Sequence, residues 1–411
     1  MRNTTRAAAT ALLTCALALP ATAAQAAPAT TETAPRTAPR TAPRTAADPT
    51  GPAAAATTEA SRLRLPAPTG PWKVGSSTLH LVDRSRPDPW VPEADGRQLM
   101  VTVHYPAARH QPSRPGPYAT RDEARLLLAQ AGVEDPAAPA RLAAMRTHGT
   151  AGARPAPGRH PLVVLSPGFG TPRFTLTALA EDLASRGYVV ASVDHAYESS
   201  GTTFPGGRVL TCVACRDVED GDPALSAVTA ARTADTRFLL DRLTGPRAAW
   251  KHAASIDTSR IGMAGHSIGG ASAAAAMLAD RRIDAGVNMD GAFWDTLPAG
   301  GLGGRPFLML GTDDETHRPG GEDTTWDRTW QALGGWKRWL TVAGTDHFSF
   351  SDGPVLQEHF GLPAGDIPAG RAVAVTRAYV AAFFDEHLRG LPQPLLAGPD
   401  PAHPEVRFHQ P

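Results

Sequence analysis

From residue 161 onward, short apolar runs alternate with longer stretches in which apolar and polar residues recur at helical spacing. The short runs are typical of strands buried on both faces, and the longer stretches are typical of helices. The predicted strands are 162–165, 188–193, 260–264, 283–288, 306–310 and 339–342, and the predicted helices are 174–186, 222–243, 268–278 and 371–388. Strands that alternate with helices form a parallel sheet covered by helices on both faces. The chain is therefore predicted to be of the α/β class, with a mostly parallel central sheet.

The hydrophobic pattern is less regular before residue 161. Residues 78–82 and 98–105 read as strands, and Pro106 closes the second one because proline cannot donate to a sheet ladder. Residues 107–160 mix Pro, Arg and Ala with one helical stretch, 120–130. This segment has two interpretations, a lid over a site and a surface excursion.

The N-terminus has the pattern of an export signal. Arg2 and Arg6 precede a short apolar run, 7–19, and Pro20 and small residues follow it. The run is too short to span a bilayer comfortably. Residues 1–27 are therefore predicted to be a signal peptide that is removed from a secreted protein; an uncleaved anchor and a lipid anchor on the cysteine of the apolar run are alternatives.

Residues 28–66 are of low complexity, and 33–44 repeat Thr-Ala-Pro-Arg three times. Proline at every fourth position prevents a helix and favours an extended, solvated chain. We predict a disordered linker here, with cell-wall binding as the alternative, and a catalytic domain at 67–411.

Composition limits the classes of partner. The chain has 411 residues, 42% of them hydrophobic, and a formal net charge of zero. Without a basic stripe, no nucleic-acid partner is expected. The sequence does not indicate an oligomeric state.

Two cysteines, Cys212 and Cys215, remain once the signal is removed. An even pair in an exported protein predicts one disulfide, within a turn that brings the two Cα atoms close together. A zinc site would need further ligands, and no second cysteine pair exists. No metal is therefore expected; a redox-active pair is the other alternative.

The strongest chemical signal is the run Gly265-His266-Ser267-Ile268-Gly269-Gly270, which matches Gly-x-Ser-x-Gly. A predicted strand precedes it and an Ala-rich helix follows it, as the strand-to-helix elbow of α/β-hydrolases requires. Such a turn leaves room only for glycine beside the serine, and it presents the hydroxyl above the sheet. We predict an α/β-hydrolase fold with Ser267 as the nucleophile.

The serine needs a base and the base needs a carboxylate. His347 follows the strand 339–342 and is the predicted base. Asp290 ends the strand 283–289, whereas Asp313 and Asp314 follow the strand 307–310. All three lie at the strand edge where ligands of open α/β sheets bind, and chain spacing alone favours Asp313 or Asp314.

The tetrahedral oxyanion of ester hydrolysis needs hydrogen-bond donors. One predicted donor is the backbone N–H of Ile268, directly after the nucleophile. The other is the N–H of Phe169 in the glycine-rich run 166–170, since Pro167 has no N–H. An ordinary glycine-rich turn is the alternative for this run.

The segment 161–195, the elbow 265–270, Asp290 and His347 together resemble the platelet-activating-factor acetylhydrolase family of serine lipases, and 69–75 is similar to its N-terminal entry. The resemblance covers about 69–390 and implies that Asp290 is the acid. It also implies that Phe169 and Ile268 are the oxyanion donors. Pro167 departs from the histidine that the family often has before the glycine.

These observations predict a secreted serine hydrolase that cleaves small-molecule or lipid esters, of short-acyl or phospholipid type, through an acyl-enzyme intermediate. The predicted chemistry requires no cofactor. Lipid esters would bring transient contact with a membrane or lipid surface. Alternatives are a hydrolase of polyesters, cutin or triacylglycerols, acyl transfer to an acceptor other than water, and a non-catalytic binding module on a hydrolase scaffold.

Overall fold

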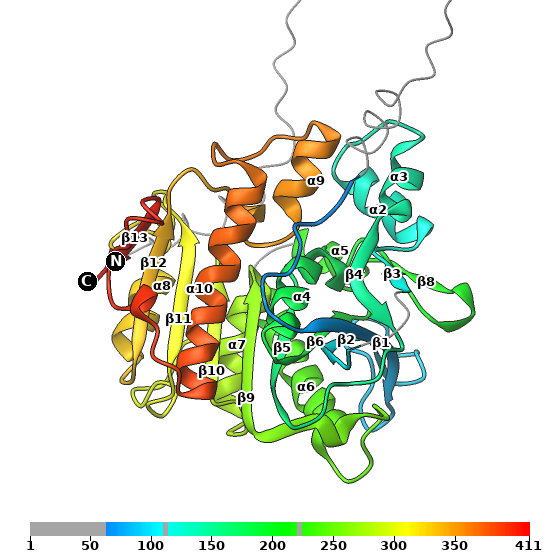
Figure 1. Ribbon diagram of the computed structural model, residues 1–411, viewed down its shortest axis with the longest axis horizontal. Helices are drawn as coiled ribbons and strands as arrows, with labels where there is room; N and C mark the ends of the chain where they lie inside the picture. Colours follow the sequence, from blue (N-terminus) through cyan, green and yellow to red (C-terminus); the bar gives the residue numbers. More distant parts are fainter. Residues whose placement is uncertain (1–62, 110–113, 220–223) are drawn as a thin grey trace, which may run out of the picture. The chain divides into compact units, whose positions relative to one another are not determined.

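The computed structural model describes residues 63–109, 114–219 and 224–411 (Figure 1). The chain divides into two units, Met1–Arg62 and Leu63–Pro411. The predicted signal peptide and most of the predicted linker therefore lie outside the described residues.

In the described part of the chain, eleven strands form one sheet in the order β13-β12-β11-β10-β9-β5-β6-β2-β1-β4-β3. Six neighbouring strands at its centre run parallel to one another. They are β12 (Lys337–Val342), β11 (Phe307–Thr312), β10 (Ala285–Met289), β9 (Ile256–His266), β5 (His160–Ser166) and β6 (Val189–His195). The sheet agrees with the prediction of a mostly parallel α/β architecture.

The outer strands are β13 (Val406–His409) at one edge and β2 (Arg97–Ala107), β1 (Lys73–Asp83), β4 (Arg146–Ala151) and β3 (Pro115–Pro117) at the other. β13, β2 and β3 each pair antiparallel with a neighbour. A separate hairpin joins β7 (Thr202–Thr203) to β8 (Val209–Leu210).

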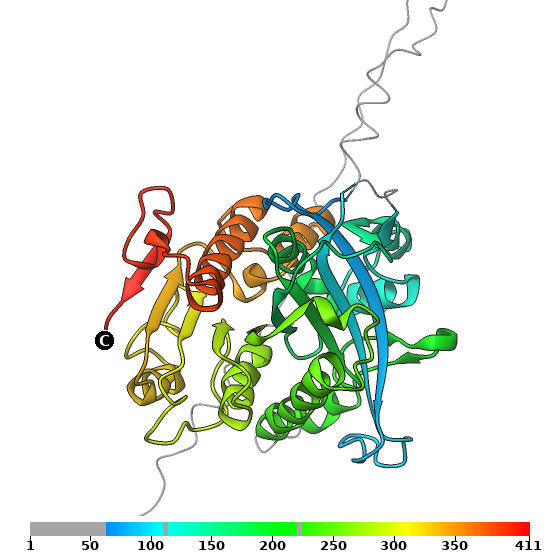
Figure 2. The same ribbon diagram turned by 60° about the horizontal axis from the view of Figure 1, so that its bottom comes forward.

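Helices cover the two faces of the sheet, and the alternation of side chains along β5 explains why both are needed. Leu162 and Val164 enter one core cluster, whereas Val163 and Leu165 enter another. The first cluster contains side chains of α6 (Ala224–Thr244), α7 (Ile268–Ala279) and α8 (Thr324–Ala332), and the second contains side chains of α4 (Thr177–Ser185) and α10 (Ala369–Arg389). Figure 2 shows α10 and the pair α6 and α7 on opposite sides of the strands.

The segment 107–160 folds into β3, α2 (Arg121–Gln130), α3 (Ala138–Ala144) and β4. Thr120 caps α2 through a reciprocal hydrogen-bond pair with Glu123, a strong local signal for the helix start. Buried side chains of α2 and α3 pack with Phe174 and with α9 (Gly353–Phe360), which Figure 1 shows beside them.

The predicted linker ends too late. Leu63 and Leu65 are buried, 9% and 3% exposed, in the same core cluster as α2 and α3. Apolar burial at these two positions offsets the entropy of ordering the chain, so the folded unit begins before Pro66.

The sequence prediction located the strands and helices of the central sheet within a few residues, with the start of helix 222–243 lying partly outside the described residues. It missed the short elements β3, α3, β4, β7, β8, α5 (Ala214–Glu219), α8, α9 and β13. These are brief and flanked by proline or glycine, so their periodicity is weak.

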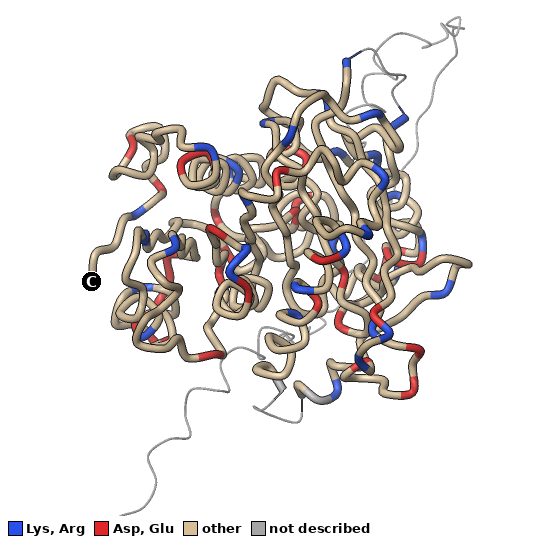
Figure 3. The backbone as a smooth tube through the Cα atoms, turned by 90° about the horizontal axis from the view of Figure 1, so that it is seen from below, with Lys and Arg blue, Asp and Glu red and all other residues tan. Residues whose placement is uncertain are grey.

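Charges of both signs are interspersed along the backbone (Figure 3), in keeping with the zero net charge of the chain. Within the described residues no helix combines the length and the apolar character that a membrane span requires.

Candidate active site

Adjacent parallel strands bring the predicted site residues to one edge of the sheet. Ser267 follows β9, Asp290 follows β10, and His347 lies five residues beyond β12. Because β9, β10, β11 and β12 are neighbours, their carboxyl ends meet at this edge. Residues separated by 80 positions in the chain therefore face a common space.

Ser267 occupies a strained turn between β9 and α7. Its φ of 57° is unusual for a residue with a side chain. The turn is fixed from both sides: the N–H of Ser267 donates to the Met289 carbonyl at 2.8 Å, and a Cβ on Gly265 would lie 2.1 Å from the Gly269 carbonyl carbon. Only glycine fits at Gly265 and Gly269, as the motif predicts, and the serine side chain stays partly exposed.

Asp290 pairs with His347. The Nδ1 atom of His347 lies 2.6 Å from Oδ2 of Asp290, and the Thr312 N–H donates to Oδ1 at 2.6 Å. The Asp290 side chain is 1% exposed and that of His347 is 39% exposed. Burial opposes ionisation of Asp290, but the charge of His317 and the contacts of His347 and Thr312 outweigh it and hold the pKa of this carboxyl well below its usual range.

Neither alternative carboxylate contacts His347. Asp313 accepts hydrogen bonds from Arg318 and Thr341, and Arg407 also pairs with it. Asp314 accepts from Nδ1 of His317 and from nearby backbone N–H groups. Chain spacing alone thus names the wrong partner for His347, whereas the family resemblance names Asp290.

A second histidine contacts the paired carboxylate. Nδ1 of His317 lies 3.5 Å from Oδ1 of Asp290 and 3.0 Å from Oδ1 of Asp314. Burial lowers the pKa of His317, but the two carboxylates raise it to about 9, so the ring is a cation at neutral pH. The sequence analysis did not identify this electrostatic role of His317. The sequence signal for this role was the position of His317 in the loop after β11, at the same edge of the sheet as Asp290.

His266 links the serine turn to the His347 loop. Its Nε2 lies 2.6 Å from the carbonyl oxygen of His347, and the two ring centroids are 4.7 Å apart. Burial and the nearby His347 lower the pKa of His266 to about 3, so it is neutral and donates from Nε2–H. Since His266 directly precedes Ser267, this hydrogen bond holds His347 beside the turn.

The glycine-rich run after β5 lies against Ser267. A Cβ placed on Gly168 would lie 3.3 Å from Cβ of Ser267. The Gly168 carbonyl accepts from the Thr171 hydroxyl at 2.9 Å. The N–H of Phe169 belongs to the same planar peptide and is anti to that carbonyl, so it points away from Thr171. Ile268 is the first residue of α7, where an N–H has no acceptor within the helix. Both predicted oxyanion donors therefore border the serine turn.

The end of α2 lies near the glycine-rich run after β5. A Cβ on Gly170 would meet the Gln130 amide at 3.0 Å, so the end of α2 lies over the run after β5.

The structure contains the Cys212–Cys215 disulfide, with the two Cα atoms 5.4 Å apart, at the start of α5. Within the described residues, no three His, Cys, Asp or Glu side chains are grouped so that they could hold a metal ion.

Comparison with known proteins places these features in context. A family model described as "Platelet-activating factor acetylhydrolase, isoform II" matches residues 58–206. The chain is 31% identical over 390 residues to the "Probable 1-alkyl-2-acetylglycerophosphocholine esterase" of Arthroderma benhamiae, covering 86% of this chain and 96% of that protein. It is 24% identical to the platelet-activating factor acetylhydrolase of Gallus gallus, covering 56% of this chain and 62% of that protein.

A solved structure is also similar. The ferulic acid esterase from Streptomyces cinnamoneus superposes with a TM-score of 0.75 and is 48% identical, over 84% of this chain and 99% of that one.

Proposed function

Because the chain belongs to the platelet-activating-factor acetylhydrolase family of α/β-hydrolases and is a carboxylic-ester hydrolase, we propose that it acts through a serine mechanism with Ser267, His347 and Asp290 as the triad. The observation that carries the proposal is the 2.6 Å contact between Asp290 and His347, held beside the strained turn of Ser267.

The geometry supports a two-step reaction. The Nδ1–H of His347 donates a hydrogen bond to Asp290. The Nε2 atom of the same ring then carries no hydrogen and can take the Ser267 proton. The serine oxygen attacks the ester carbonyl, and the N–H groups of Phe169 and Ile268 stabilise the oxyanion. Collapse of the intermediate expels the alcohol, which receives the proton from His347, and water then releases the acid by the same route.

The serine mechanism is tested with the substitution Ser267→Ala. We expect the kcat on p-nitrophenyl acetate to fall by at least about 10⁴-fold and labelling by a fluorophosphonate probe to disappear, because the nucleophile is lost. Ser192→Ala is the control, since Ser192 is buried in β6, unlike the partly exposed Ser267, and its hydroxyl has no hydrogen-bond partner among the described residues. Full activity of the Ser267 variant would refute the mechanism.

Two classes of acyl group are candidates. The similarity to an acetylglycerophosphocholine esterase supports short acyl groups, as the sequence analysis proposes. One observation favours aromatic acyl groups: Phe348, next to His347, is 46% exposed, and its ring centroid lies 5.6 Å from that of His347. An exposed ring at the catalytic edge offers a stacking surface to a hydroxycinnamoyl ester.

The ratio of kcat/KM for methyl ferulate and p-nitrophenyl acetate separates the two. If an aromatic acyl group stacks on Phe348, Phe348→Ala lowers kcat/KM for methyl ferulate about tenfold and leaves the acetate within about twofold. If Phe348→Ala lowers kcat/KM equally on both esters, Phe348 does not select an aromatic acyl group, and short acyl groups remain the proposed substrate class.

Secretion is part of the proposal and rests on residues 1–27, which lie outside the described residues. N-terminal sequencing of protein recovered from the culture medium tests it. Cleavage after residue 24, 26 or 27 is expected, and an intact N-terminus retained in the cell would contradict it.

A further inference from the structure

A second Ser-His-Asp array lies beside the predicted oxyanion loop, and it is fully buried. Oγ of Ser166 is 3.1 Å from Nε2 of His195, and Nδ1 of His195 is 2.7 Å from Oδ2 of Asp235. These three residues are 0%, 2% and 0% exposed. An ester carbonyl has no route to Ser166, so the array cannot act as a second catalytic triad, and another reason for its burial is needed.

Paired charges surround the array. Arg97 donates to Asp235 at 2.9 Å, to Glu198 at 2.6 Å and to Asp88 at 3.0 Å. Arg232 donates from Nε to Glu198 at 2.8 Å. Burying charges is costly unless each has a partner, and here every one of them is paired.

The protonation states follow from these contacts. Arg97 and the hydrogen bond from His195 overcome the effect of burial and hold the pKa of Asp235 far below its usual range. Burial and the charge of Arg232 lower the pKa of His195, so the ring is neutral. Nδ1–H of His195 then donates to Asp235, and Nε2 accepts the Ser166 hydroxyl hydrogen.

This network holds the loop 166–170 at both ends. Nη1 of Arg232 donates to the Pro167 carbonyl at 2.5 Å and to the Ser166 hydroxyl at 3.2 Å. At the other end, the N–H of Gly170 donates to the Glu198 carbonyl at 2.9 Å. Arg232 also pairs with the Glu198 carboxylate, so a buried ion pair joins the two residues that hold the flanks of the segment containing Phe169.

The carbonyl of Pro167 is the critical point. A peptide unit is planar, so Arg232 fixes the plane that joins Pro167 to Gly168. The next peptide presents the Phe169 N–H, and it is confined between this anchored plane and the Gly170 N–H bond to Glu198. We propose that Arg232, paired with Glu198, is a positioning residue that aims the Phe169 N–H at the developing oxyanion. This inference rests on the proposed serine mechanism and identifies a residue about 65 positions from the loop that it orients.

The test is Arg232→Lys, which keeps the positive charge but cannot hold Pro167, Ser166 and Glu198 at once. We expect kcat on p-nitrophenyl acetate to fall about 30- to 300-fold with KM within about threefold, because oxyanion stabilisation acts in the transition state. The inhibition constant of a trifluoromethyl ketone, whose adduct carries an oxyanion at the same place, should rise by a similar factor.

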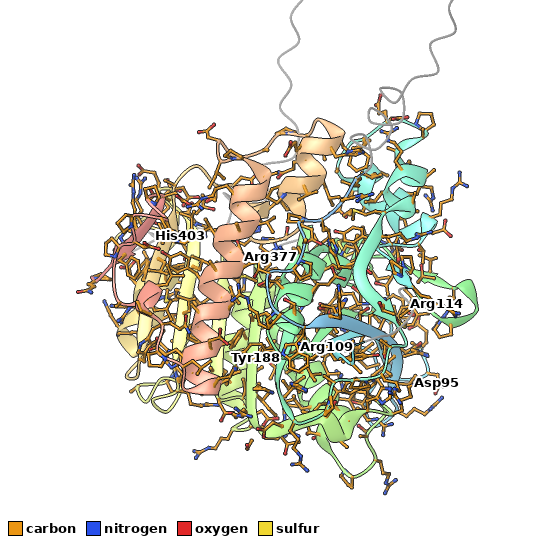
Figure 4. All side chains as sticks on the ribbon, viewed as in Figure 1. Asp95, Arg109, Arg114, Tyr188, Arg377 and His403 are labelled. Atoms are coloured by element: carbon orange, nitrogen blue, oxygen red, sulfur yellow. A yellow bond between two sulfur atoms is a disulfide. The ribbon has the colours of Figure 1, made fainter. Side chains whose placement is uncertain are left out.

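Arg377→Lys is the matched control. Arg377, labelled in Figure 4, comes from α10, is 4% exposed and also donates to backbone carbonyls, those of Ala178, Ala67 and Pro66. Its replacement should lower the Tm comparably and leave kcat within about twofold. This comparison separates loss of stability from loss of oxyanion positioning.

Should Arg232→Lys fail to fold, the double variant Arg232→Met with Glu198→Gln removes the ion pair without leaving an unpaired buried charge. A folded Arg232 variant with wild-type kcat, or an equal loss of kcat in the Arg377 control, would overturn the inference. Ser267→Ala is assayed alongside: if it stays active, the serine mechanism fails, and if it is inactive while Arg232→Lys is normal, only the positioning role fails.

Discussion

The substitution Asp290→Asn tests the pairing on which the proposed mechanism depends. The Thr312 N–H donates to Oδ1 of Asp290 at 2.6 Å, so the amide oxygen of the asparagine keeps this position. The amide nitrogen then replaces Oδ2 and faces Nδ1 of His347, 2.6 Å away in the wild type. Two donors cannot face each other, so the imidazole adopts the tautomer with hydrogen on Nε2 and cannot accept the Ser267 proton.

The expected loss follows from this change of tautomer. Holding a catalytic histidine in the wrong tautomer lowers kcat by about 10⁴-fold, which corresponds to about 5.5 kcal/mol of transition-state stabilisation. The fold should survive, since asparagine has nearly the same size and retains the Thr312 hydrogen bond. The assay is kcat on p-nitrophenyl acetate at neutral pH, with the Tm measured on the same preparation.

Asp313→Asn is the control for this measurement. Asp313 lies at the same edge of the sheet but is paired with Arg318 and Arg407. Its replacement should leave kcat within about threefold, with a modest loss of stability. The reasoning is refuted if Asp290→Asn keeps more than about a tenth of the wild-type kcat, or if Asp313→Asn loses as much as Asp290→Asn.

Three further predictions follow from buried contacts. The pKa of His317 is raised from 6.5 to about 9, so its stabilising effect is complete below pH 6.5 and is lost as the pH rises through 9. In urea unfolding, the free energy of unfolding of the wild type should fall by up to about 3 kcal/mol over this range relative to that of His317→Gln. Parallel pH profiles of the two proteins would contradict this. The variant Ser166→Ala should still be labelled by the fluorophosphonate probe, because Ser166 is fully buried. Loss of labelling would contradict the assignment of Ser267 as the nucleophile. Gly265→Ala should lower stability by more than about 3 kcal/mol, because its Cβ would lie 2.1 Å from the backbone of Gly269, whereas Gly370→Ala, with open space around it, should be neutral in thermal unfolding.

Local sequence signals predicted the framework of the site. The Gly-x-Ser-x-Gly run between an apolar strand and an Ala-rich helix names Ser267 because the turn is made by neighbouring residues. His347 could be chosen for a similar reason, since it follows a short apolar strand near the end of the chain. Both predictions need only the order of elements along the chain.

The partners of these residues could not be read from spacing. Asp313 follows the strand next to that of His347, yet its carboxylate turns toward Arg318 and Arg407. Asp290 follows the strand beyond, and its backbone adopts a φ of 61°, with its N–H bonded to Leu310. The direction of each side chain depends on such a turn, which the pattern of apolar residues does not encode.

The sequence by itself determined the alternation of strands and helices, the serine turn and the family resemblance, because each depends on residues that are near one another in the chain or on motifs in a fixed order. The contact of Asp290 with His347, which the resemblance implied and chain spacing did not, is visible only in the tertiary structure. Only the tertiary structure decided that His317 adds a charge and that Arg232 reaches the loop of Phe169. These contacts join residues 27 to 65 positions apart, so they exist only where the order of strands in the sheet brings their loops together.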